Sequence, residues 1–249
     1  MLHPPRARAA DDPPLTADGP DSPDPDVAGP APAPGSAPGP APGPAAAALA
    51  GVTAGWVEGL PVVRDLDLRV APGGVVRLDG PNGTGKSTVV ELLSGYLRPW
   101  TGAVTVLGHD AGSTAARALR RVVRTRPALY DHMTVRDHLL LMARLQGDDP
   151  DRQVERAERF GLARWLDERA ADLSSGTAKK LWYVLGSCGD PRLLVLDEPF
   201  NAVDEDGVRA MVRDLDEAAG AHRTVLVVCH AVPPGLAVDR TVRLAPGLP

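Results

Sequence analysis

The sequence predicts an α/β fold with a mainly parallel core sheet covered by helices on both faces. The short segments 193–197 and 224–229 are apolar except for Asp197 and Thr224, which is typical of strands buried on both sides. Segments with helical periodicity precede and separate them, and strands that alternate with helices favour a parallel sheet. The third observation is a glycine-rich loop at 80–85, placed between an expected strand at 75–78 and an expected helix that begins near Lys86.

The other expected elements follow from periodicity and turn residues. Leu66, Leu68 and Val70 alternate with charged residues, which indicates a half-buried strand. Ala-Pro-Gly-Gly at 71–74 then forms a turn. Helices are expected at 113–121, 135–146, 151–160, 175–188 and 205–219.

The first 45 residues differ in composition from the rest. They contain 14 of the 26 prolines and no Phe, Tyr or Trp. Such a segment buries little apolar surface, and its prolines remove backbone donors. We predict a disordered, partly polyproline-like tail at 1–45 and a single domain at 46–249. A docking arm for a partner is the alternative for the tail.

Charge and cysteine content exclude several classes of protein. The formal net charge is −5, and the tail alone holds six aspartates against two arginines, so the domain is close to neutral. No nucleic-acid partner is expected for a near-neutral domain. Cys188 and Cys229 are too few and too distant for a disulfide framework, which favours a reduced, cytoplasmic chain. No apolar segment has signal-peptide or membrane-helix length, so work at a membrane requires a partner that holds the chain there.

The glycine-rich loop matches the Walker A pattern G-x-x-x-x-G-K-[ST] and predicts a phosphate-binding site. Glycines let backbone N–H groups approach phosphate oxygens, and the helix start adds its positive dipole end. Lys86 is placed to reach the β- and γ-phosphates, and Ser87 to ligate Mg²⁺. Lys86 is also one of only three lysines in the chain, which argues against a glycine-rich turn with a chance lysine. The predicted nucleotide-binding residues here are Gly80, Pro81, Asn82, Gly83, Thr84, Gly85, Lys86, Ser87 and Thr88.

Two acids follow the apolar segment 193–196. Asp197 stands at the carboxyl end of an expected buried strand, where ligands bind in such sheets, and is expected to hold Mg²⁺ through water. Glu198 is placed to polarise an attacking water. Paired acids that simply cap a loop are the alternative for these two residues.

Leu173-Ser-Ser-Gly-Thr177 opens an expected helix between these two motifs. In that position it resembles the signature sequence of ABC-type ATPases, usually LSGGQ. The resemblance implies that Ser174, Ser175 and Gly176 bind the γ-phosphate of an ATP held by a second subunit, which is again anion capture at a helix start. Taken alone, the same residues are a common helix cap.

The resemblance to ABC-type ATPases covers residues 48–245 and implies further site residues. Asp204 lies in a segment similar to the D-loop and is expected to cross a dimer interface. His230 ends an apolar strand and resembles the switch histidine that contacts the γ-phosphate. Trp56 resembles the aromatic residue that stacks on adenine, with a partly buried core tryptophan as the alternative. The implied fold is a nucleotide-binding core with an antiparallel edge sheet and a helical subdomain at about 128–188.

The chain departs from the family pattern at two places. Thr125 stands where the family usually has a glutamine that ligates Mg²⁺ and senses the permease, and threonine is shorter. The signature has Ser175 and Thr177 in place of glycine and glutamine. We expect these changes to slow hydrolysis or alter coupling while the set of Lys86, Asp197, Glu198 and His230 remains complete.

The resemblance implies an ATP-binding and ATP-hydrolysing subunit of an ABC transporter, with ATP and Mg²⁺ as cofactors. It implies a homodimer or heterodimer of ATPase subunits, held on the inner face of the cell membrane by a separate transmembrane permease. The short chain and the Glu-Pro-Phe-Asn-Ala segment favour export over import. There are two alternatives. One is a soluble ABC ATPase without a transporter, and the other is an ATP-dependent switch with impaired hydrolysis, which the replacement of the usual glutamine by Thr125 allows. Translation-type members usually carry two cassettes, and repair-type members need an insertion longer than the 87 positions from Lys86 to Leu173.

Overall fold

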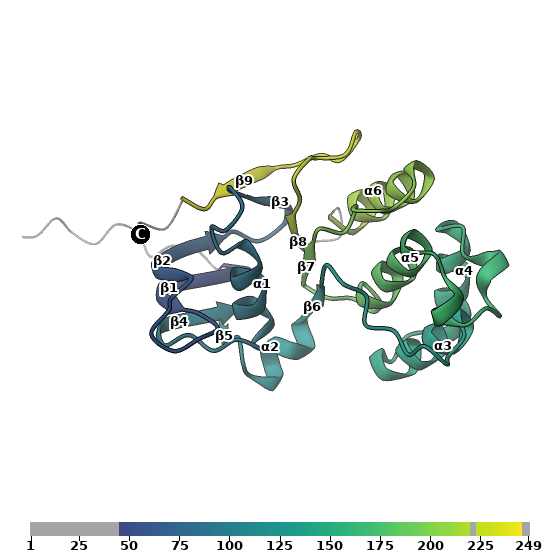
Figure 1. Cartoon of the computed structure of the whole chain (residues 1–249), viewed down its shortest axis with the longest axis horizontal. Helices are drawn as coiled ribbons and strands as arrows, with labels where there is room; N and C mark the ends of the chain where they lie inside the picture. Colours follow the sequence, from purple (N-terminus) through teal and green to yellow (C-terminus); the bar gives the residue numbers. More distant parts are fainter. Residues whose placement is uncertain (1–44, 220–222, 246–249) are drawn as a thin grey trace, which may run out of the picture. The chain divides into compact units, whose positions relative to one another are not determined.

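The computed structural model of the protein describes residues 45–219 and 223–245. The tail predicted at 1–45 lies outside these residues, apart from Ala45. The described chain forms a parallel sheet, an antiparallel sheet and a set of helices, which confirms the predicted α/β class (Figure 1).

The core sheet is parallel throughout its described strands. Its spatial order is β6-β7-β8-β3-β9, and each neighbouring pair runs parallel. The strands are β6 (Arg120–Val123), β7 (Leu193–Asp197), β8 (Thr224–Val228), β3 (Gly74–Asp79) and β9 (Arg240–Arg243). The carboxyl ends of β7, β8 and β3 therefore lie next to one another at one edge of the sheet.

A second sheet is antiparallel, as the family resemblance implied. Its order is β2-β1-β4-β5, with antiparallel pairing at every described contact. The strands are β1 (Ala47–Ala54), β2 (Val63–Val70), β4 (Thr101–Val106) and β5 (His109–Asp110). The segment 55–62 connects β1 to β2 and therefore lies at one end of this sheet.

Six α-helices complete the described chain: α1 (Lys86–Ser94), α2 (Thr114–Leu119), α3 (Val135–Gln146), α4 (Pro150–Arg159), α5 (Ser175–Gly186) and α6 (Glu205–Ala219). Two 3₁₀ turns, Ala163–Trp165 and Ala170–Asp172, connect α4 to α5. α3 begins with a capping box between Thr134 and Asp137 and ends at Gly147, whose left-handed backbone closes the last turn. α3, α4 and α5 contact one another and form a helical group within the range expected for the subdomain (Figure 1).

The C-terminal boundary of the helix predicted at 113–121 is wrong. α2 stops at Leu119, and Arg120–Val123 is strand β6, which pairs with β7. The β-branched pair Val122 and Val123 favours a strand, and the two arginines before it hide the strand pattern in the sequence. Arg120 is buried, and its guanidinium donates to the carbonyl of Ser94 at the end of α1.

Two apolar clusters occupy the two faces of the core sheet. Along β7, Leu193 and Val195 belong to the cluster shared with α1 and the antiparallel sheet. Leu194 and Leu196 belong to the other cluster, which α3, α5 and α6 cover. Because both faces of β7 are buried, its sequence is continuously apolar and ends in acids only where the strand leaves the core.

Cys188 and Cys229 are both buried, and neither forms a disulfide within the described residues. No helix within residues 45–219 and 223–245 combines the length and the apolar character needed to cross a membrane.

Candidate nucleotide site

The candidate site lies at the carboxyl ends of β3, β7 and β8. β3 leads into the loop 80–85, β7 ends at Asp197, and β8 is followed by Cys229 and His230. Because these three strands are neighbours in a parallel sheet, their following loops share one edge. The fold therefore brings together segments that are more than a hundred residues apart in the sequence.

The loop 80–85 needs its glycines for backbone geometry. Gly83 and Gly85 have φ of 84° and 92°, a region that side chains rarely adopt. A Cβ at Gly85 would lie 2.7 Å from Cγ1 of Val63, so the position is also closed sterically. Gly85 is the N-cap of α1 and supplies no side-chain cap, so the first-turn N–H groups of α1 face the loop as anion donors. This geometry suits phosphate groups.

Lys86 lies along the same loop. Its Nζ donates to the carbonyls of Gly80 at 2.6 Å and Pro81 at 2.9 Å. An ammonium has three donors, so a third remains for an anion that enters the loop. Ser87 is exposed on the first turn of α1, whereas Thr84 and Thr88 are buried. Ser87 is therefore accessible to a ligand, and Thr88 supports the helix from within.

Asp197 is buried, with 7% of its surface exposed, at the end of β7. Its Oδ2 accepts a hydrogen bond of 2.7 Å from the hydroxyl of Thr125, which follows the adjacent strand β6. A carboxylate and a hydroxyl are hard oxygen donors of the kind that Mg²⁺ prefers. With the Ser87 hydroxyl and phosphate oxygens, this donor set fits the expected metal.

Glu198 has an unusual backbone. Its φ is +49°, and its N–H donates to the carbonyl of Val228 in β8 at 2.9 Å. Its carboxylate accepts from Nδ2 of Asn201 at 3.3 Å and lies 3.5 Å from Nε2 of His230. The structure thus places Glu198 and His230 side by side at the edge where the phosphate loop begins.

Trp56 lies in the turn after β1 and is 54% exposed. This exposure argues against the alternative of a core tryptophan. Neighbouring Val57 and Leu60 are exposed as well, so the indole stands on an accessible apolar surface. A large exposed ring of this kind is available for stacking on a base.

Ser174 begins α5 as its N-cap. Its hydroxyl accepts from the N–H of Thr177 at 3.1 Å, so the residue does act as the helix cap that its sequence pattern allowed. Ser175 is exposed, and a Cβ at Gly176 would lie 2.6 Å from the carbonyl oxygen of Ala202. The start of α5 therefore packs directly on the segment 198–204 that follows Glu198.

Asp204 has both carboxylate oxygens engaged within the chain. Oδ1 accepts from the N–H of Gly207, and Oδ2 accepts from Nζ of Lys180 at 3.0 Å. The hydrogen bond from Lys180, with the one from the Gly207 backbone, lowers the pKa of Asp204. Within the described part of the chain, neither Ser174 nor Asp204 hydrogen-bonds to the loop 80–88.

Sequence patterns missed two residues around Glu198. Lys179 donates from Nζ to the carbonyl oxygen of Glu198 at 3.1 Å, and Asn201 donates to the Glu198 carboxylate. Burial lowers the pKa of Lys179. The scarcity of lysine in this arginine-rich chain could have pointed to Lys179. The chain has three lysines, Lys86, Lys179 and Lys180, and in the structure each contacts the candidate site or the segment beside it.

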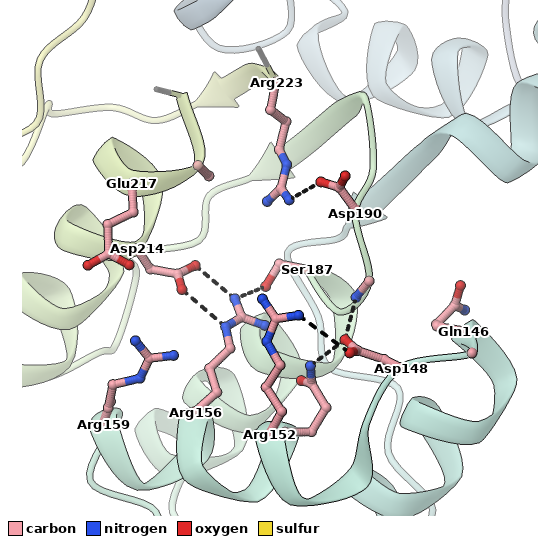
Figure 2. Close-up of a pocket in the computed structure, with 14 residues that line it drawn as sticks. Gln146, Asp148, Arg152, Arg156, Arg159, Ser187, Asp190, Asp214, Glu217 and Arg223 are labelled. Carbon is pink, nitrogen blue, oxygen red and sulfur yellow. Dashed lines mark hydrogen bonds and ion pairs between the residues drawn. The ribbon is translucent and has the colours of Figure 1, made fainter. Parts of the chain in front are cut away.

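A large cavity of about 620 Å³ lies elsewhere, between α4, the end of α6 and the segment 187–190 (Figure 2). Asp190 and Arg223 on its wall precede the amino ends of β7 and β8, so it is at the opposite edge of the sheet from the site. Two charges on its wall are paired with each other, since Arg156 forms two hydrogen bonds with Asp214, at 3.0 and 2.7 Å. This cavity is therefore lined by charged side chains of both signs and is separate from the candidate nucleotide site.

Comparison with known proteins shows which family the chain resembles. Residues 63–201 match the family described as ABC transporter. An ABC transporter ATP-binding/permease protein of Mycobacterium tuberculosis is 32% identical over 191 residues, which is 73% of this chain and 22% of that protein. The Nod factor export ATP-binding protein I of Rhizobium meliloti is 34% identical over 177 residues, 68% of this chain and 52% of that protein. A solved ATP binding subunit of an ABC transporter has a TM-score of 0.72 and 26% identity, and the alignment covers 81% of this chain and 86% of that one.

Proposed function

The chain belongs to the ABC transporter family, and we propose that it binds and hydrolyses ATP with Mg²⁺ to power transport through a membrane permease. The observation that carries the proposal is the shared edge of the core sheet. There the fold brings together the glycine loop with Lys86, the acid pair Asp197 and Glu198, and His230. The chain spans only 22% of the mycobacterial relative and 52% of the Rhizobium relative, so the activity of the whole assembly is part of the proposal.

ATP would bind with its phosphates in the loop 80–85. The N–H groups at the start of α1 and the third donor of Lys86 would hold the β- and γ-phosphates. The exposed indole of Trp56 would stack on adenine. These contacts use backbone dipoles, one cation and one ring, which together suit a nucleoside triphosphate.

Mg²⁺ would lie between the phosphates, the hydroxyl of Ser87 and the carboxylate of Asp197, and it would neutralise charge that develops during phosphoryl transfer. Thr125 holds one oxygen of Asp197 by a hydrogen bond, which leaves the other oxygen for the metal or its water. The side chains of Ser87, Asp197 and Thr125 would thus orient Mg²⁺, with Asp197 as the charged group among them.

Glu198 would accept a proton from, or polarise, the attacking water. Asn201 and His230 flank its carboxylate on two sides and limit its rotamers. His230 is exposed two residues after β8, and it would contact the γ-phosphate as well. A general base held in this manner contributes typically 10²- to 10⁴-fold in rate, so about that much activity depends on Glu198.

Two such chains, identical or different, would close on two ATP molecules, and Ser174, Ser175 and Gly176 of each would complete the site of the other. Hydrolysis would reopen the pair, and a permease would convert this cycle into transport. Export is the favoured direction, since the Rhizobium relative is named for export. The permease would hold the chain on the inner face of the membrane.

The test is a pair of substitutions measured for ATP binding and phosphate release. Lys86→Ala should abolish ATP binding, and Glu198→Gln should bind ATP yet release phosphate about 100-fold more slowly. Glu155→Gln, an exposed glutamate on α4, serves as the matched control and should behave like the native protein. Unchanged turnover in Glu198→Gln would remove Glu198 from the catalytic role. Native protein that binds ATP without releasing phosphate would favour the hydrolysis-impaired switch instead.

A further inference from the structure

The second turn of α5 is joined to the segment 198–204 at both ends of that segment. Lys179 donates to the carbonyl oxygen of Glu198 at 3.1 Å, and the next residue, Lys180, donates to Asp204 at 3.0 Å. Between these two contacts, Gly176 approaches the carbonyl oxygen of Ala202 so closely that a Cβ there would lie 2.6 Å from it. α5 thus supports the whole segment that carries Glu198.

Glu198 needs such support because its backbone conformation is costly. A non-glycine residue with a φ of +49° is held in the left-handed region, which persists only when surrounding contacts determine it. On the N-terminal side, the N–H of Glu198 donates to Val228 in β8. On the C-terminal side, among the hydrogen bonds of the described residues, the partner of its carbonyl oxygen is Lys179.

We propose that Lys179 is a positioning residue for hydrolysis: its ammonium holds the Glu198 carbonyl and so fixes the Glu198 carboxylate between Asn201 and His230. This inference rests on the proposed role of Glu198. Rotation of the peptide after Glu198 would displace the chain that follows it, including Asn201, whose amide donates to the Glu198 carboxylate. A charge-assisted hydrogen bond to that peptide oxygen opposes the rotation more strongly than a neutral one.

The surroundings of Lys179 agree with a role beyond surface solvation. The side chain is part-buried, and burial lowers its pKa, whereas the nearby charges of Glu198 and Asp197 act in the opposite direction. A long side chain loses rotamer entropy when it is fixed, so the contact that Lys179 makes must offset this free-energy cost. In this chain arginine outnumbers lysine strongly, yet a lysine, with its single compact ammonium, stands here.

The experiment compares Lys179→Met, Lys179→Gln and Lys179→Arg in the full chain by steady-state ATP hydrolysis. Lys179→Met removes the donor and should lower kcat about tenfold or more, because a small misplacement of a catalytic group is that costly. KM for ATP should stay within about twofold, since the phosphate loop is untouched. Lys179→Arg keeps a charged donor and should recover most of kcat, with Lys179→Gln in between. Arg144→Met, which removes an exposed cation from α3, is the control for loss of charge.

The outcomes separate this inference from the proposed function. If Glu198→Gln slows phosphate release about 100-fold and Lys179→Met retains a kcat within about twofold of native, the positioning role is wrong and the proposed function stands. A fall in kcat matched by an equal rise in KM, or one that Lys179→Arg does not recover, also overturns it. If Lys179→Met does not fold, the ranking of the Arg variant over the Gln variant in kcat at unchanged KM decides the question, and equal values refute the inference.

Discussion

The hydroxyl of Thr125 donates a hydrogen bond of 2.7 Å to Oδ2 of Asp197. This contact follows from the topology, because Thr125 comes two residues after β6 and β6 pairs in register with β7, which ends at Asp197. A carboxylate accepts, so the single hydroxyl proton of Thr125 is used on Asp197 and its oxygen lone pairs stay available. Thr125 therefore orients the acid that we expect at the metal.

Removing the Thr125 hydroxyl should lower the apparent affinity for Mg²⁺ in ATP hydrolysis. We expect Thr125→Val to raise the Mg²⁺ concentration for half-maximal ATP hydrolysis about tenfold, the lower end of what loss of an outer-shell partner costs. Thr125→Gln, whose amide reaches further, should lower that concentration below the native value and raise the hydrolysis rate. A Mg²⁺ titration of phosphate release measures both effects, with Thr105→Val in β4 as the control for a threonine-to-valine change. Equal Mg²⁺ dependence in all four proteins would contradict an orienting role.

Much of the fold was predictable because its elements carry strong local patterns. β7 and β8 are continuously apolar, and α3 and α6 match the expected 135–146 and 205–219 to the residue. β6 was not predictable from its own residues. Two arginines precede two valines there, and the strand exists only because β7 offers it a paired edge. Tertiary pairing decided that element.

The site was predictable where the chemistry lies in one continuous motif and not where it depends on contacts across the fold. The loop around Lys86 and the acids at Asp197 and Glu198 are local patterns. Lys179 and Asn201 join Glu198 only after α5 packs on the segment 198–204. Single residues of this kind have no periodicity or spacing that marks them in a sequence.

The Arg156–Asp214 pair should be a main support between the helical group and the core. Arg156 on α4 also donates to the hydroxyl of Ser187 (Figure 2). It donates to the carbonyl of Val184 as well, and Tyr183 donates to Asp214. The side chains of Arg156 and Asp214 are 10% and 17% exposed. Breaking such a buried pair commonly costs 3 to 5 kcal/mol, so we expect Arg156→Met to lower the free energy of unfolding by about 3 kcal/mol. Thermal unfolding should then occur roughly 6 to 12 °C lower.

The exposed pair Arg136–Asp167 provides a matched control for this prediction. Its aspartate is 87% exposed, so Arg136→Met should change the free energy of unfolding by less than about 1 kcal/mol. The double variant Arg156→Met/Asp214→Leu should recover part of the loss, because it removes the unpaired carboxylate. Urea unfolding of the three variants gives the comparison, and an Arg156→Met protein as stable as Arg136→Met would refute the structural role.

The same pair should make stability sensitive to acid. Burial raises the pKa of Asp214, but hydrogen bonds and charge from Arg156, with the hydrogen bond from Tyr183, outweigh it and leave the pKa below its usual value. A carboxyl with a depressed folded pKa stabilises above its unfolded value of about 3.9 and loses that contribution as pH falls further. The stability difference between native protein and Asp214→Asn should therefore be full at pH 7 and shrink below about pH 4. Urea midpoints at both pH values measure it, and a constant difference would contradict the assignment.

ATP should bring two chains together through the start of α5. In one chain Gly176 packs on Ala202, and among the N–H groups of the described residues the Ser174 hydroxyl accepts only that of Thr177. The other N–H groups at the start of α5 therefore remain as donors for a phosphate held by another chain. ATP places several negative charges between the facing surfaces, and these charges need the second set of donors. Glu198→Gln protein, which should retain ATP, is therefore expected to sediment as a monomer without nucleotide and as a dimer with ATP and Mg²⁺. Adding Ser174→Arg should block that dimer by bulk, whereas Ala163→Arg, at an exposed position, should leave it intact. A Glu198→Gln protein that stays monomeric at saturating ATP and micromolar protein would contradict the shared site.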